Sequence, residues 1–355
     1  MPTTPQIRIL VVDDSVVARR VISDILGDES DFDVVGTAPN GQVALTKISR
    51  LQPDLVTLDI DMPELDGMET LAAIRSDHPD VRVIMVSNHT IRGASITVEA
   101  LFLGASDYVT KASRSSSAEE AREYLRDQLV PKVRSLSPAS STPRPPRAGK
   151  ATVDIGQKRR DQAVNAVVIG SSTGGPNALT SVLGSLPADF PVPVLIVQHL
   201  PENFTTFLAR RLDSACALPV REATNRTTIE PGQVWIAPGN LHLEAHTSSR
   251  GTQMKTSDGP MVNSCRPAAD ILFRTAAACF GPGTLAVVLT GMGQDGLDGC
   301  RTIRRIGGQI IVQDRATSVV WGMPGQVAEA GLADAILPIS EIGAEVVRRV
   351  KAQRS

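Results

Sequence analysis

The sequence lacks the features that mark several classes of protein. It has four cysteines, Cys216, Cys265, Cys279 and Cys300, and no two of them form a CxxC pair, so neither a zinc site nor a disulfide framework is indicated. No apolar run approaches the roughly 18 residues of a membrane span, and residues 1–8 lack the apolar core of a signal peptide. A reduced, cytoplasmic protein is therefore expected.

An excess of charge of one sign is also missing. Lys and Arg total 36 and Asp and Glu total 38, so the net charge of −2 excludes a uniformly basic nucleic-acid-binding protein. The chain has 355 residues, of which 42% are hydrophobic, and this length is typical of two globular domains. The small net charge is the sum of unequal parts: −7 over residues 1–136, +5 over 137–160 and 0 over 161–355.

Residues 137–160 differ in composition from both flanking regions. They are rich in Pro, Ser and basic residues and are too poor in apolar residues to form a packed core, which predicts a flexible linker. Domains are therefore expected at 1–136 and 161–355. Both regions alternate β-branched apolar runs with amphipathic stretches, which predicts two α/β domains, each a doubly wound parallel sheet. Strands are expected at 8–13, 32–38, 55–59, 82–87 and 107–109, and then at 166–170, 192–199, 285–290 and 309–313, with β-hairpins within 219–260 (WIAPGN, LHLE and QMKTSDG) inserted into the second sheet.

Acidic residues follow the expected strands of the first region. Asp13 and Asp14 end the first strand, Asp59 ends the third, and Lys111 follows the fifth. In a parallel sheet these ends meet at one edge, where clustered carboxylates favour Mg²⁺. A carboxylate beside Mg²⁺ and a lysine can accept a phosphoryl group, and Ser87 could hydrogen-bond one of its oxygens. Any one of these aspartates alone is typical of a solvated turn, but the ordered set favours a site.

These residues resemble the receiver domain of bacterial two-component response regulators over about residues 1–125. The resemblance implies a flavodoxin-like fold in which Asp59 accepts the phosphoryl group, Ser87 and Tyr108 are the switch residues, and Lys111 contacts the phosphate. Asn88 departs mildly from the family, in which a small serine is common at this position. The matching motifs are VVDDS (11–15), LDIDMPELDG (58–67), MVSN (85–88) and YVTK (108–111).

The same resemblance implies a Mg²⁺ site needed for phosphorylation. Asp14, Asp59 and the backbone carbonyl of Asp61 would bind the ion, and Asp13 would act through a water molecule. All four positions carry the residues that the family's motif requires.

In the second region, a serine, a histidine and an aspartate follow different expected strands. Ser172 lies in GSSTGGP (170–176), a Gly-rich strand-to-helix turn whose N–H groups can support an oxyanion. His199 ends a strand, and Asp295 follows another in GMGQDG (291–296). A nucleophile, a base and an orienting carboxylate form a triad defined by geometry and not by chain order. Taken singly, Ser172 and Asp295 could be helix caps and His199 a core histidine.

GMGQDG also matches the GxGxxG pattern of dinucleotide-binding proteins. It follows a strand and precedes a helix, and Asp314 comes 18 residues after Gly296, near the spacing of a ribose-binding carboxylate. Against this interpretation, Asp295 would bring a negative charge close to the pyrophosphate. The interpretation also leaves Ser172 and His199 without a role.

The second region resembles, over nearly its whole length, the catalytic domain of the chemotaxis protein-glutamate methylesterases. The resemblance implies a Rossmann-like domain with Ser172 as nucleophile, His199 as general base and Asp295 as its orienter, Met292 as a backbone oxyanion donor and Thr173 in support. The matching stretches are IGSSTGGP (169–176), QHLPENFTTFLARRL (198–212), WIAPGNLHL (235–243), LTGMGQDG (289–296), QDRATSVVWGMP (313–324) and LADAILPI (332–339). The sequence departs at CRPAAD (265–270), where the family usually reads HRPSVD.

The family resemblance implies a phosphorylation-activated serine esterase. Its substrates would be glutamate methyl esters, and selected glutamines for deamidation, on the cytoplasmic helices of chemoreceptors. The receiver would inhibit until a chemotaxis histidine kinase phosphorylates Asp59, and the esterase step would need no cofactor. A monomer is expected. Two alternatives are a triad hydrolase of the same fold acting on a non-chemotaxis protein ester, and a non-enzymatic regulator that binds nucleic acid. The zero net charge of 161–355 and its α/β pattern, without a helix-turn-helix, argue against the latter.

Overall fold

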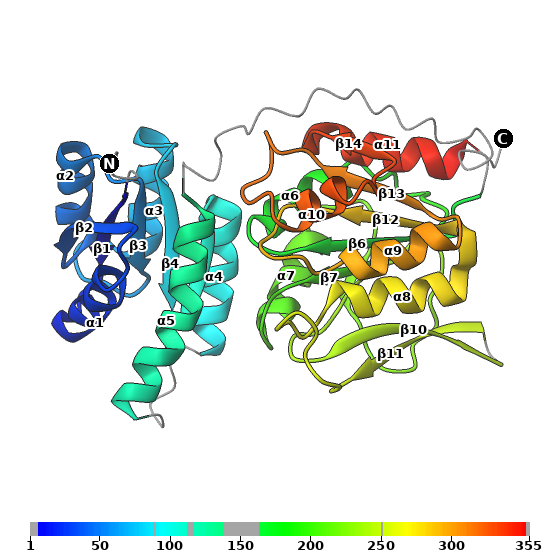
Figure 1. Ribbon diagram of the computed structural model, residues 1–355, viewed down its shortest axis with the longest axis horizontal. Helices are drawn as coiled ribbons and strands as arrows, with labels where there is room; N and C mark the ends of the chain where they lie inside the picture. Colours follow the sequence, from blue (N-terminus) through cyan, green and yellow to red (C-terminus); the bar gives the residue numbers. More distant parts are fainter. Residues whose placement is uncertain (1–5, 88–89, 112–116, 138–162, 250, 353–355) are drawn as a thin grey trace. The chain divides into compact units, whose positions relative to one another are not determined.

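The computed structural model describes residues 6–87, 90–111, 117–137, 163–249 and 251–352. The chain divides into two compact units, Met1–Pro146 and Arg147–Ser355 (Figure 1). Most of the predicted linker, 138–160, lies outside the described residues, as does Asn88.

The first unit alternates strands and helices around a parallel sheet. Its strand order is β2-β1-β3-β4-β5, and every neighbouring pair is parallel. The doubly wound sheet predicted from the sequence is confirmed. The elements are β1 (Ile7–Val12), α1 (Val16–Gly27), β2 (Phe32–Ala38), α2 (Gly41–Leu51), β3 (Leu55–Asp59), α3 (Gly67–Asp77), β4 (Arg82–Ser87), α4 (Ile91–Leu103), β5 (Asp107–Thr110) and α5 (Ala118–Ser135).

Local sequence signals set the helix starts that bring the first site together. The Ser15 side chain accepts from Ala18 N at the start of α1, and Asp66 and Glu69 form a capping box at the start of α3. Helix α3 also packs directly on the end of β3, because a Cβ at Gly67 would lie 2.2 Å from the backbone oxygen of Asp59. Only glycine allows this approach.

The second unit is built on a larger parallel sheet. Its strand order is β14-β13-β12-β6-β7-β9-β8, again with parallel neighbours. The elements are β6 (Ala166–Ser171), α6 (Gly175–Leu183), β7 (Val194–Gln198), α7 (Phe204–Asp213), β8 (Val220–Glu222), β9 (Val234–Ile236), β10 (His242–Ser248), β11 (Gly251–Ser257), α8 (Ala269–Phe280), a 3-10 turn (Gly281–Gly283), β12 (Thr284–Val288), α9 (Leu297–Arg305), β13 (Gln309–Gln313), α10 (Met323–Glu329), β14 (Ala335–Leu337) and α11 (Ile339–Lys351).

The prediction of inserted hairpins is correct for one segment and wrong for another. LHLE and QMKTSDG supply the antiparallel pair β10–β11, which forms its own two-stranded sheet against α8 (Figure 1). WIAPGN instead supplies β9, which pairs in parallel with β7 and β8 in the main sheet. Its brevity and its flanking Pro and Gly resemble a hairpin, but Val234, Trp235 and Ile236 are buried as in a parallel strand.

The register of the second sheet brings the candidate catalytic segments to one edge. Ser171 pairs with Gln198, and Gly170 pairs with both Val197 and Val288, so β6, β7 and β12 end at the same level. Ser172, His199 and the loop that carries Asp295 continue from these ends. Among the helices of the described residues, none combines the length and apolarity needed to cross a membrane.

Candidate functional sites

Three carboxylates meet at the carboxyl edge of the first sheet. Oxygens of Asp13, Asp14 and Asp59 lie within 4.8 Å of one another. The Lys111 ammonium lies 2.8 Å from Asp13 Oδ2 and 3.0 Å from Asp59 Oδ1. Burial raises the pKa of Asp59 to about 6, and the charge of Asp13 adds to the rise, while Lys111 opposes it. The charge on this buried carboxylate is therefore incompletely compensated.

The cluster fits a hard divalent cation. One ammonium does not neutralise three carboxylates, and carboxylate oxygens are the ligands that Mg²⁺ prefers. Asp61 lines the same surface pocket as Asp14, together with Met62 and Arg92. The structure thus brings together three of the four aspartates, Asp13, Asp14 and Asp59, with Lys111, and it places the fourth in a pocket that Asp14 also lines.

The two predicted switch residues lie on the adjacent strands β4 and β5, and one of them contacts this cluster through Lys111. Ser87 is the last residue of β4 and is fully buried, and its carbonyl oxygen accepts from Lys111 N at 2.8 Å. Tyr108, in β5, is also buried, and the Lys132 ammonium lies 4.6 Å from the centre of its ring. Backbone pairing with Lys111 therefore links Ser87 directly to the predicted phosphate-binding lysine.

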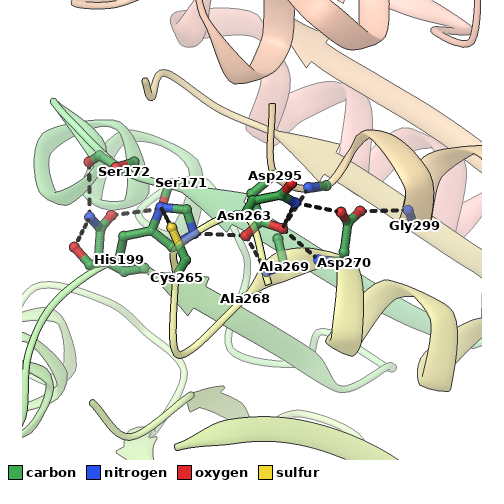
Figure 2. Close-up of polar contacts among 12 residues, drawn as sticks. Ser171, Ser172, His199, Asn263, Cys265, Ala268, Ala269, Asp270, Asp295 and Gly299 are labelled. Carbon is green, nitrogen blue, oxygen red and sulfur yellow. Dashed lines mark hydrogen bonds and ion pairs between the residues drawn. The ribbon is translucent and has the colours of Figure 1, made fainter. Parts of the chain in front are cut away.

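In the second unit, the His199 ring lies between a carboxylate and a thiol (Figure 2). His199 Nε2 is 2.8 Å from Asp295 Oδ2, and Nδ1 is 3.6 Å from Cys265 Sγ. The side chains of His199 and Asp295 are 13% and 2% exposed. Because an ionised carboxylate only accepts hydrogen bonds, Nε2 donates its proton to Asp295 and Nδ1 is left as the acceptor in the neutral ring.

Asp295 is held by an unusually complete set of donors. Burial alone would raise its pKa, but the hydrogen bonds from His199 and from backbone N–H groups outweigh burial and lower it, so the carboxylate stays ionised. Besides His199, the donors are Ala269 N at 2.6 Å to Oδ2, and Asp270 N at 3.1 Å, Gly296 N at 3.0 Å and Asn263 Nδ2 at 3.3 Å to Oδ1 (Figure 2).

Sequence reasoning missed several residues of this network. Asn263 also donates to Asp270 Oδ2 at 2.9 Å, and Asp270 accepts from Gly299 N at 2.6 Å. Cys265 stands out in the sequence only as one of four cysteines without a CxxC pair and as a departure from the family motif, and neither observation assigns it a role in the site. Nothing in the sequence signals Asn263, because it lies on a loop 32 residues before Asp295.

Ser172 stands on the turn between β6 and α6, at the same sheet edge. Its backbone oxygen accepts from Gly175 N at 2.8 Å and from Gln198 Nε2 at 2.9 Å. A Cβ at Gly291 would lie 2.8 Å from Ser172 Cβ, so this glycine lets the loop after β12 approach the serine. Within the described ranges, no hydrogen bond joins Ser172 Oγ to the His199 ring.

The two predicted supporting residues flank Ser172. Thr173 is buried, and its carbonyl oxygen accepts from Thr290 Oγ1 at 2.9 Å, which ties the turn to the loop that follows β12. Met292 follows Gly291, the residue that packs against Ser172, so its backbone lies in the adjoining loop. The structure thus places both residues beside the serine.

The alternative roles conflict with the geometry. The N-cap of α6 is Gly174 and that of α9 is Gly296, so neither Ser172 nor Asp295 is the capping residue. The carboxylate that the dinucleotide interpretation assigns to the ribose has a local structural role, because Asp314 Oδ1 closes its own turn by accepting from Thr317 N at 3.0 Å and Thr317 Oγ1 at 2.6 Å.

The fold and the two sites define a class of protein: a receiver domain joined to an α/β domain that carries Ser, His and Asp at one sheet edge. Comparison with known families agrees with this class. The model of the CheB methylesterase family matches residues 167–346, and that of the response regulator receiver domain matches 9–122. The chain belongs to the CheB methylesterase family.

Full-length relatives share the whole architecture. A protein-glutamate methylesterase/protein-glutamine glutaminase of Trichodesmium erythraeum is 49% identical over 98% of this chain and 99% of its own length. One from a Nocardioides species is also 49% identical, over 99% and 97% of the two chains. The crystal structure of the Thermotoga maritima CheB methylesterase catalytic domain is 41% identical, covers 53% of this chain and 99% of its own, and has a TM-score of 0.51. The expected pairing of a receiver with a methylesterase domain is confirmed.

Proposed function

We propose that this chain hydrolyses γ-glutamyl methyl esters on the cytoplasmic helices of chemoreceptors and deamidates selected glutamines there. The observation that carries the proposal is the His199 Nε2 to Asp295 Oδ2 contact of 2.8 Å, at the sheet edge where Ser172 stands. The names of the full-length relatives support this reaction class.

The proposed chemistry uses each group according to its position. Ser172 Oγ attacks the ester carbonyl while His199 takes its proton at Nδ1, since Asp295 occupies Nε2. The ionised Asp295 stabilises the imidazolium that forms, and the N–H of Met292 supports the oxyanion. The imidazolium then protonates the departing methanol, or ammonia from a glutamine, and water hydrolyses the acyl-enzyme with the same imidazole as base.

Phosphorylation of Asp59 is proposed to relieve inhibition by the receiver, with a chemotaxis histidine kinase as donor. Asp14, Asp59 and the Asp61 carbonyl would hold Mg²⁺, which would neutralise charge on the phosphoryl oxygens. Lys111 is 3.0 Å from Asp59 and would contact the phosphoryl group. A phosphoryl group shifts the equilibrium only through contacts that differ between the two states, for which Ser87 and Tyr108 are the proposed carriers.

Methanol release from methylated receptor membranes tests this function. The wild-type chain is expected to release methanol, and faster with Mg²⁺ and an acyl phosphate donor. Asp59→Asn is expected to show equal rates with and without the donor. The matched control is Asp61→Asn, which keeps the backbone carbonyl and should keep the stimulation. Hydrolysis of a simple methyl ester without methanol release from receptors would favour a non-chemotaxis substrate.

The pH dependence of kcat/KM tests the environment of His199. Burial lowers the pKa of the ring, but hydrogen bonds to Asp295 and Cys265 outweigh burial and raise it. Only the neutral ring is a base, so kcat/KM is expected to rise with pH over a range above the ordinary histidine value of about 6.5. Cys265→Ala removes one raising contact and should move this rise to lower pH. The pH profiles are measured on a soluble methyl ester. Identical profiles for the wild-type protein and Cys265→Ala would contradict the proposed effect of Cys265 on His199.

A further inference from the structure

The His199 and Cys265 side chains are spaced as two ligands of one soft metal ion. Nδ1 and Sγ lie 3.6 Å apart. Zn–N bonds of about 2.0 Å and Zn–S bonds of about 2.3 Å at a tetrahedral angle place nitrogen and sulfur about 3.5 Å apart. The two atoms therefore lie at the separation of two corners of a zinc tetrahedron.

The imidazole nitrogen that faces away from Cys265, Nε2, makes the hydrogen bond that is typical of a metal-binding histidine. A metal-binding histidine usually donates its other ring N–H to a carboxylate, which fixes the tautomer and makes the ligating nitrogen more basic. Asp295 does this at Nε2, at 2.8 Å, and backbone N–H groups fix Asp295 in turn. With both carboxylate oxygens engaged, Asp295 is a supporting group and not a third ligand.

The thiol is held in place by a tight turn. Val262 and Cys265 exchange two backbone hydrogen bonds, of 3.1 and 2.9 Å, and the two residues between them, Asn263 and Ser264, have φ values of 51° and 60°. Two left-handed residues between paired neighbours are typical of a type I′ turn. Asn263 Nδ2 also bonds both Asp270 and Asp295, so the turn is anchored to the carboxylate network. Cys265 is partly exposed, so an ion can enter with water as its remaining ligands.

We propose that a thiophilic divalent cation such as Zn²⁺ binds His199 Nδ1 and Cys265 Sγ and inhibits the esterase. On binding, the Cys265 thiol releases its proton to solvent, as does Nδ1 of any His199 ring that is protonated, and the thiolate and the neutral imidazole form the two protein bonds. The inhibition rests on the proposed function, because the metal occupies the nitrogen that must take the proton of Ser172. The metal binding itself is independent of the proposed function.

Direct spectroscopy with Co²⁺ tests the binding. The full chain is kept reduced by a phosphine, and excess Mg²⁺ occupies the carboxylate cluster of the first unit. Wild-type protein is expected to show a thiolate-to-cobalt charge-transfer band that Zn²⁺ abolishes. Cys265→Ala should lack the band. The matched control is Cys216→Ala, which removes a partly exposed thiol elsewhere in the same unit and should keep the band.

Methanol release measured in parallel tests the consequence. Zn²⁺ at about ten times its measured Kd is expected to lower the wild-type and Cys216→Ala rates about tenfold, because about nine-tenths of the sites are then occupied. The ratio of rates with and without Zn²⁺ should be close to one for Cys265→Ala. Absence of the band in wild-type protein, or its persistence in Cys265→Ala, overturns the metal site. Failure of metal-free wild-type protein to release methanol would instead overturn the proposed function, and the cobalt band distinguishes the two.

Discussion

Replacing Ser172 by alanine is expected to abolish methanol release and to leave the catalytic unit folded. Loss of the nucleophilic serine in a triad hydrolase lowers kcat by about 10⁶-fold, which takes the rate to the assay background. The fold should be unaffected, because the contacts that hold Ser172 are made by its backbone, with Thr290, Gly175 and Gln198. Single-turnover methanol release checks the loss of activity, and thermal unfolding of the same preparation checks that the fold is intact.

The neighbouring serine provides the matched control. Ser171 is fully buried, and its hydroxyl donates to Gln198 Oε1 at 2.7 Å. Ser171→Ala leaves that buried oxygen without its donor, at a cost of about 1–3 kcal/mol in the free energy of unfolding. The variant should therefore melt earlier than Ser172→Ala but release methanol at a rate close to wild type. If Ser172→Ala still turned over, or if Ser171→Ala were the inactive one, the nucleophile would be misassigned.

Asp295→Asn is expected to lower kcat by about 10⁴-fold, with KM much less affected. The corresponding change in a serine protease triad has this size, because the histidine loses the tautomer and orientation that catalysis needs. The two carboxylate oxygens accept from His199, from three backbone N–H groups and from Asn263. An asparagine must turn its amide N–H₂ toward some of these donors. We therefore also expect a lower unfolding temperature.

Nuclear magnetic resonance titration of His199 distinguishes the loss of the carboxylate that orients the ring from a general disruption of the fold. Removal of the Asp295 charge should lower the pKa of the ring, since that carboxylate raises it. The matched control is Asp298→Asn, in the first turn of α9. The Asp298 side chain is 65% exposed and, in the described part of the chain, its one ion pair is with Arg301, so kcat and the His199 pKa should not change. A kcat within tenfold of wild type in Asp295→Asn would contradict the assigned role.

The carboxylate cluster could be predicted because each of its residues lies at or just after the end of a strand. Asp59 is the last residue of β3, Asp13 and Lys111 directly follow β1 and β5, and parallel strands bring their carboxyl ends to one edge of the sheet. The same rule placed Ser172, His199 and Asp295. The hairpin prediction was wrong for Val234–Ile236, which pair in parallel with β7 and β8. Three residues flanked by turn formers do not reveal whether they pair with a neighbour in sequence or with a distant strand.

The sequence by itself determined the two parallel α/β domains and which polar residues end their strands. Hydrophobic periodicity and the succession of strands and helices along the chain can both be read from the sequence. It also excluded a zinc site of the CxxC type, since that depends on spacing alone. Only the tertiary structure decided which His199 nitrogen faces Asp295, and that Asn263 and Cys265 reach the same site. Those contacts join residues up to 96 positions apart and depend on a two-residue left-handed turn and on the packing of α8 against β10. No local sequence pattern predicts these contacts, because tertiary packing determines which side chains meet across a loop.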